Sequence, residues 1–216
     1  EPFVQYIQSS KDIQFIVIGG NIAYNYGQTS CAFRWDKWLY WYSENIKSKA
    51  GLLLPFVFAI GNTESRFGYA RIDPLFNILA TEKTYRIIAN QYLVLFSFAL
   101  APANATGLTT INSILNSKNT YHSHVLSPTT SMLFLDTDIV ESIPAQNTFI
   151  NTTLSDPTYA TTENKIVVYH GSAYPALLDK YGSTIAMAIR SNWIPLFESH
   201  AVAVVFENDC NSSNDF

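Results

Sequence analysis

The sequence lacks the patterns that mark several large classes of protein. It has only two cysteines, Cys31 and Cys210, and they do not form the closely spaced groups that bind zinc. It has no run of lysine or arginine and a formal net charge of −4, so we expect no nucleic-acid partner. No apolar stretch reaches the roughly 18 residues of a membrane-spanning helix, so we expect no transmembrane segment. Internal repeats and linkers are also missing, and we expect one domain over residues 1–216.

Apolar and aromatic residues are abundant. Hydrophobic residues make up 48% of the chain and aromatic residues 14%, which suits one folded domain with a large core. Short apolar runs alternate with segments of helical spacing, and residues 101–130, rich in Asn, Ser and Thr, are expected to form a long loop. The pattern predicts strands over 13–18, 52–60, 92–99, 131–136, 165–169 and 202–206, and helices over 33–46, 71–82 and 184–199. This alternation indicates an α/β layered fold with polar loops at one end of the sheet.

The segment 33–46 is the clearest amphipathic helix. Its apolar side chains, Phe33, Trp38, Tyr42 and Ile46, keep helical spacing. Such an aromatic stripe is more typical of core packing than of a cofactor site.

Polar motifs follow the predicted strands in a fixed order. They are GGNIAY (19–24), RWDKWL (34–39), PFVFAIGNTES (55–65), TYHSH (120–124), LFLDT (133–137), KIVVYHGSAYP (165–175) and WIPLFESHAVAVVFEND (193–209). In order and spacing this set resembles the calcineurin-like metallophosphoesterases, in particular the purple acid phosphatase branch, over nearly the whole chain. The resemblance implies a sandwich of two mixed sheets flanked by helices. It also implies a two-metal site at the strand ends that hydrolyses phosphate esters.

The resemblance assigns site roles to individual positions, some kept and some replaced. Asn62 matches an amide ligand of the family, His170 its single-histidine ligand and Tyr24 its metal-bound tyrosine. The replaced positions are Asn21 for the bridging aspartate, Thr63 for a phosphate-contacting histidine, and Asp209 and Asn211 for the final histidine pair.

These replacements remove most of the expected ligands. An amide such as that of Asn21 has one neutral oxygen and cannot bridge two cations as a carboxylate does. We therefore expect no catalytic residues and no metal cofactor, where the family would use two divalent or trivalent ions. The expected function is that of an inactive pseudoenzyme, a structural or binding module in an assembly. The alternative is an active or weakly active phosphoesterase with a metal on His170, Asn62 and Asp209.

The same resemblance suggests a secreted or cell-surface protein, with the lumen of an organelle as the alternative. N-glycosylation candidates are then Asn104, Asn151 and Asn211, although the composition alone yields about as many such triplets by chance. The resemblance also places Cys31 and Cys210 at the metal end, where they could form a disulfide. The alternative is two independent buried thiols.

Relative to the family, the chain is expected to lack the first strand, with its D-x-H motif, and the C-terminal strands. Strand 13–18 would then have an open edge, so we expect either further sequence of a longer polypeptide or other protein chains as partners beside it. Other polar residues are expected to have structural roles. Glu64 should hold loop backbone, His122 and His124 should order a loop, and Asp136 and Asp138 should stabilise a turn.

Overall fold

The computed structural model describes residues 2–10, 12–65, 92, 95–96, 119–175 and 181–209. In the first half of the chain the elements are α1 (Pro2–Ser9), β1 (Ile16–Ile18), η1 (Thr29–Cys31), α2 (Phe33–Asn45), β2 (Phe56–Phe58) and η2 (Asn62–Glu64). In the second half they are β3 (His122–Ser127), β4 (Thr130–Phe134), η4 (Pro144–Gln146), α6 (Asn147–Ser155), α7 (Pro157–Ala160), β5 (Asn164–Tyr169), α9 (Thr184–Asn192), α10 (Ile194–Ser199) and β6 (Val204–Glu207).

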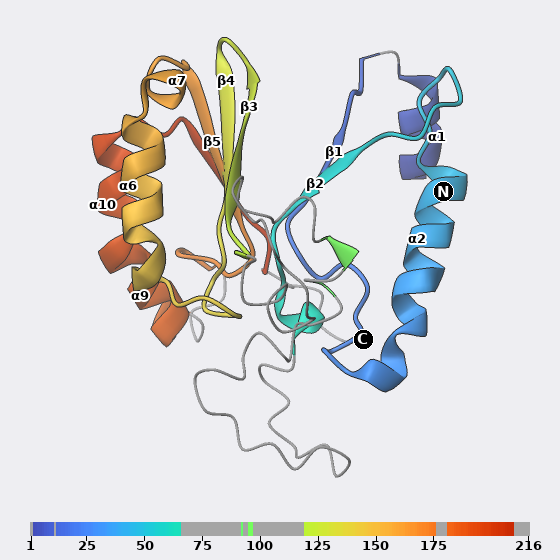
Figure 1. The fold of residues 1–216 in the computed structure, drawn as a ribbon, viewed down its shortest axis with the longest axis horizontal. Helices are drawn as coiled ribbons and strands as arrows, with labels where there is room; N and C mark the ends of the chain where they lie inside the picture. The colour runs from blue at the N-terminus through green and yellow to red at the C-terminus, as the bar shows by residue number, and fades with distance from the viewer. Residues whose placement is uncertain are drawn as a thin grey trace, which may run out of the picture.

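The strands form two sheets. β1 pairs in parallel with β2, with Ile16 opposite Phe56. The second sheet has the order β3-β4-β5-β6, in which β3 and β4 are antiparallel and the other neighbours are parallel. The two sheets face each other, with α1 and α2 outside one sheet and α6, α9 and α10 outside the other (Figure 1). The fold is therefore mixed α/β with two sheets and flanking helices, as the sequence predicts.

Apolar layers among the described residues hold this arrangement together. Between the sheets, Ala59 after β2 packs with Met132, Phe134 and Val168 of β4 and β5. Under α1 and α2, the side chains of Val4, Ile7, Tyr42, Ile46 and Leu54 form a separate cluster. The largest cluster joins the four-stranded sheet to its helices and contains Leu133, Leu135, Ile143, Ile150, Leu154, Val167, Tyr169, Ala173, Ile189, Trp193 and Phe197. Successive side chains of β4 and β5 point to opposite faces of the sheet. These two strands therefore contribute both to the layer between the sheets and to the layer under the helices.

The strand predicted over 92–99 is wrong where the structure describes it. Tyr92 and Leu95 are helical, and the Phe96 amide donates to the Tyr92 carbonyl at 3.1 Å. Tyr92 is buried against the rings of Trp35 and Phe58 instead of pairing in a sheet. A short apolar run suits a buried helix as well as a buried strand, and here packing decides.

Other differences have local causes. The loop predicted over 101–130 contains β3, which pairs with β4 across a tight turn. The helix predicted over 184–199 is divided into α9 and α10, because Pro195 has no amide hydrogen to continue the first helix. The first two predicted strands are shorter than expected and cover only residues 16–18 and 56–58. The helix predicted over 71–82 lies outside the described residues. Within the described part, no helix is long and apolar enough to cross a membrane.

Candidate functional site: the loops at the strand ends

The carboxyl ends of β1, β2 and β5 bring three loops into contact. A side chain at Gly20, which has φ +101°, would meet Gly61 Cα at 2.7 Å and His170 Nδ1 at 2.8 Å. A side chain at Gly61 would collide with the backbone amide nitrogen of Asn21. Glycine is therefore required at both positions, and the motifs GGN and GNTE meet through their backbones.

Glu64 ties these loops together from a fully buried position. Its carboxylate accepts hydrogen bonds from four backbone amides and from the Thr63 hydroxyl. The amides are those of Asn21 at 2.8 Å, Ile22 at 2.7 Å, Ala23 at 3.3 Å and Gly61 at 3.0 Å. Burial raises the pKa of Glu64 above its usual value, and these hydrogen bonds work against that shift. The expectation that Glu64 holds loop backbone is confirmed.

Asn21 and Thr63, two of the replaced positions, bind each other. Asn21 Oδ1 accepts from the Thr63 amide at 3.2 Å and lies 2.9 Å from Thr63 Oγ1. The single Oγ1 proton is shared with Glu64 Oε1 at 3.1 Å. An amide oxygen has two lone pairs, so both are engaged within the protein. We call this pair the Asn21–Thr63 clasp.

His170 lies at the end of β5 and is 3% exposed. Its Nδ1 is 3.0 Å from the Gly19 carbonyl, which can only accept, so Nδ1 carries a proton. Its Nε2 faces two oxygens, Asn62 Oδ1 at 3.3 Å and Asp209 Oδ1 at 3.5 Å. This geometry is satisfied by a second proton on the ring, by a bound cation, or by the Asn62 amide turned to donate its NH₂. Three predicted site residues are thus brought together.

The site residues that the structure describes do not fit a two-metal centre. The oxygen of Asn21 is engaged in the clasp and cannot also bridge two ions. The Thr63 hydroxyl is directed to Asn21 and Glu64. Among the described residues, no group of three or more His, Cys, Asp and Glu side chains is placed to hold a metal ion. Asn62, His170 and Asp209 are the only predicted ligands that lie close together within the part described, and they would hold one ion at most.

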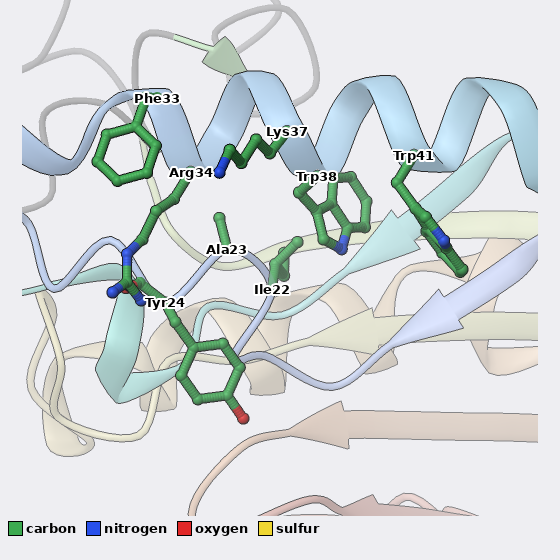
Figure 2. Close-up of a pocket in the computed structure, with 8 residues that line it drawn as sticks. All are labelled: Ile22, Ala23, Tyr24, Phe33, Arg34, Lys37, Trp38 and Trp41. Atoms are coloured by element: carbon green, nitrogen blue, oxygen red, sulfur yellow. The ribbon is translucent and has the colours of Figure 1, made fainter.

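The remaining predicted residues are more scattered. Tyr24 is exposed, and its ring points away from α2 (Figure 2) and packs edge-on against Tyr26. Asn151 is exposed on α6, with Oδ1 3.0 Å from His200 Nε2. Cys31 forms no disulfide with any described residue, and its Sγ lies 3.5 Å from Gln28 Oε1. The predicted positions Asn104, Cys210 and Asn211 lie outside the described residues, so the disulfide and two glycan sites remain predictions.

Asn208 is a residue of this region that the sequence does not single out. Its side chain donates to the Tyr169 carbonyl at 2.9 Å, and its backbone amide donates to the His170 carbonyl at 3.0 Å. The Asp209 amide also donates to the His170 carbonyl, at 2.7 Å. These bonds continue the β5–β6 pairing and hold Asp209 beside His170. Asn208 could have been found from its position directly after β6, because β6 pairs in parallel with β5 and the two strands end side by side.

His122 and His124 form a second polar pair, placed in β3 and not in a loop as expected. His122 Nε2 is 2.9 Å from the Phe58 carbonyl at the end of β2 in the opposite sheet. His122 Nδ1 is 3.0 Å from His124 Nε2. Nearby, the buried Asp136 carboxylate accepts from Thr120 Oγ1 and from the amides of 139, 140 and 141, as a turn-forming acid does.

Comparison with known proteins adds no assignment. No model of a known protein family matches the sequence, and no curated protein matches it. The resemblance to metallophosphoesterases therefore rests on the motifs quoted above.

The Asn21–Thr63 clasp predicts an energetic coupling between two positions 42 residues apart. Asn21→Ala, Thr63→Ala and the double variant should give non-additive free energies of unfolding, with a coupling of about 1 kcal/mol. Urea denaturation of the four proteins measures this. Additive effects would show that the two side chains do not stabilise each other.

Proposed function

We propose that this protein has a metallophosphoesterase-like fold but is catalytically inactive, and that it serves as a structural or binding module in an assembly. The Asn21–Thr63 clasp is the observation that carries the proposal. The family resemblance requires a metal bridge at position 21 and a phosphate contact at position 63. Here the two side chains form hydrogen bonds with each other instead. Their local role is to join the loops after β1 and β2.

Charge balance supports the same proposal. Two divalent ions a few Å apart need several anionic ligands between and around them. Of the resemblance-based positions that the structure describes, only Asp209 bears a carboxylate, and its side chain is 32% exposed. The nearby Glu64 carboxylate is already occupied by backbone amides. Two closely spaced cations would therefore repel each other without compensation.

The expected result is that the purified protein does not hydrolyse a chromogenic phosphate monoester, with or without added Zn²⁺, Mn²⁺ or Fe²⁺. The assay should cover acidic and neutral pH and should include a His170→Ala variant as the control for contaminating phosphatase. The same background rate in both proteins supports inactivity. Metal-stimulated turnover that His170→Ala abolishes would overturn it.

An altered, single-metal phosphoesterase is the second candidate. Its supporting observation is that His170 Nε2 faces oxygens of both Asn62 and Asp209. Titration calorimetry with Zn²⁺ and Mn²⁺ discriminates between the two functions. Binding that Asp209→Ala abolishes and that the exposed control Glu163→Ala leaves unchanged would favour this candidate. Binding that neither substitution alters would count against it.

We place the protein at the cell surface or outside the cell as part of the same proposal, with other chains as partners. Asn151 is the glycosylation candidate that the structure describes, and it is exposed on α6. A mass shift of secreted protein that peptide-N-glycosidase removes, and that Asn151→Gln reduces, would support this setting. Unmodified Asn151 in protein made in a glycosylating host would count against it.

A further inference from the structure

A groove of about 570 Å³ runs beside α2, outside the strand-end loops. Its walls come from α2 and from the loop after β1. Ile22 and Ala23 point toward α2, whereas the ring of Tyr24 points away from it (Figure 2). It is lined by Ile22, Ala23, Tyr24, Phe33, Arg34, Lys37, Trp38 and Trp41.

The helical repeat explains how α2 supplies one wall. Phe33, Lys37 and Trp41 are spaced by four residues, so they form one stripe along the helix. Trp35 and Tyr42 point instead into the core. The opposite wall is held in place by Arg34, whose guanidinium donates to the Tyr24 carbonyl at 2.9 Å.

The groove is apolar in its walls and cationic at its rim. Phe33 is 49% exposed and Trp41 is 39% exposed, so large aromatic surface faces solvent. Lys37 Nζ lies 5.4 Å from the centre of the Phe33 ring, and Arg34 Cζ lies 5.8 Å from the centre of the Tyr26 ring. Among the described residues that line the groove there is no aspartate or glutamate, although the whole chain carries a net charge of −4. The local charge is therefore opposite to that of the molecule.

This composition is typical of a protein-binding surface. Tryptophan, tyrosine, phenylalanine and arginine are the residues that interfaces concentrate at their energetic centres. A small-molecule site would enclose most of its ligand, whereas here the aromatic rings and both cations remain exposed along the side of a helix. An extended segment lying along α2 fits this shape better.

We propose that the α2 groove docks an acidic segment of a partner protein that carries an aromatic or large apolar anchor residue. The anchor packs against Trp38 and Trp41, and its neighbouring carboxylates face Lys37 and Arg34. The proposal deepens the binding-module function proposed above and rests on it for its biological meaning. The phosphatase assay tests inactivity without involving the groove, so the two proposals can fail separately.

The test is selection of random linear peptides displayed on phage against the immobilised full chain. Enriched peptides should combine aromatic and acidic residues. Synthetic versions should lose about tenfold or more in affinity, measured by fluorescence anisotropy, when Trp41 is changed to alanine or Lys37 to glutamate. Binding should also weaken as ionic strength rises, because the charged contacts lie at an exposed rim.

Two matched variants serve as controls. Tyr40→Ala removes an aromatic ring from the same helix. Tyr40 is 71% exposed and lies outside the groove. Lys49→Glu reverses an exposed charge elsewhere in the described part. Both should bind the peptides as the wild type does. No enrichment, enrichment of basic peptides, or binding equally insensitive to Trp41→Ala and Tyr40→Ala would overturn the proposal. Binding to anionic lipid vesicles in place of peptides would also overturn it.

Discussion

Replacing Glu64 by alanine is expected to lower the free energy of unfolding by about 4 kcal/mol. The substitution removes the acceptor of four backbone amides and one hydroxyl in a site with no solvent access. Each buried donor left without a partner costs on the order of 1–3 kcal/mol, and water entering the space would recover part of this. Because a domain of this size is stable by roughly 5–15 kcal/mol, the loss should shift the urea midpoint strongly.

Two further variants make the Glu64 prediction specific. Glu64→Gln keeps the size and one acceptor oxygen but turns an NH₂ group toward amide donors, so its loss should be intermediate, about 2 kcal/mol. Glu44→Ala, at an exposed position on α2, should change stability by less than about 0.5 kcal/mol. If Glu64→Ala and Glu44→Ala unfold at the same urea concentration, the carboxylate does not hold the loops together.

The sequence predicts the centre of the fold better than its margins. The runs at 131–136 and 165–169 form strands β4 and β5, because each lies between two apolar layers and must be apolar on both faces. β3 was not predicted, because its sequence, HSHVLS, has little strand character of its own and depends on pairing with β4. The segment 92–99 failed for the opposite reason, since its apolar character is shared by buried helices.

The sequence identified residues of the candidate site but not all of the contacts between their side chains. The family resemblance implied that the loops carrying Asn62, His170 and Asp209 converge. In the structure, His170 Nε2 lies 3.3 Å from Asn62 Oδ1 and 3.5 Å from Asp209 Oδ1. The Asn21–Thr63 clasp could not be predicted in this way. A comparison of motifs says which ligand is missing, but the direction in which the new side chain turns depends on the backbone, and Asn21 has φ +56°.

Acidification is expected to destabilise the wild-type protein by about 3 kcal/mol relative to a His122→Phe variant. His122 is mostly buried and stacks on Phe134 with ring centres 4.8 Å apart. Its Nε2 faces the Phe58 carbonyl and so carries the proton of the neutral ring, while Nδ1 accepts from His124 Nε2. Burial, followed by the neighbouring His124, lowers the pKa of His122 to about 4. The neutral ring is satisfied, and a second proton would face a donor.

The direction of this effect follows from proton binding. The pKa of histidine in an unfolded chain is near its ordinary value of 6.5, above the folded value of about 4. Between these values the unfolded state binds more protons, so stability falls as the pH falls. The free energy of unfolding is unaffected by His122 above about pH 6.5. The difference between pKa values of 6.5 and about 4 corresponds to a loss of about 3 kcal/mol near pH 4.

The pH profile of the wild-type protein by itself does not reveal the contribution of His122, because Asp136 contributes in the opposite direction. Burial raises the pKa of Asp136 from 3.8 to about 6, although its hydrogen bonds lower it. The folded state then binds the proton first, and stability rises by about 2 kcal/mol as the pH falls from about 7 to about 4. The contributions of Asp136 and His122 therefore oppose each other in the wild-type protein. Asp136 and the other titrating groups are present in both proteins, so the difference in stability between the wild type and His122→Phe reports the contribution of His122.

The measurement is urea denaturation of both proteins from about pH 7 to about pH 4, with the difference in free energy of unfolding plotted against pH. Phenylalanine keeps the ring that stacks on Phe134, so the variant should fold even though its bond to the Phe58 carbonyl is lost at every pH. Val125→Ala, a substitution in the same strand that removes no titrating group, should differ from the wild type by a constant amount. A difference for His122→Phe that is equally constant would mean that His122 gains its proton in the folded sandwich as easily as in the unfolded chain. The ring would then not be a neutral bridge between the two sheets.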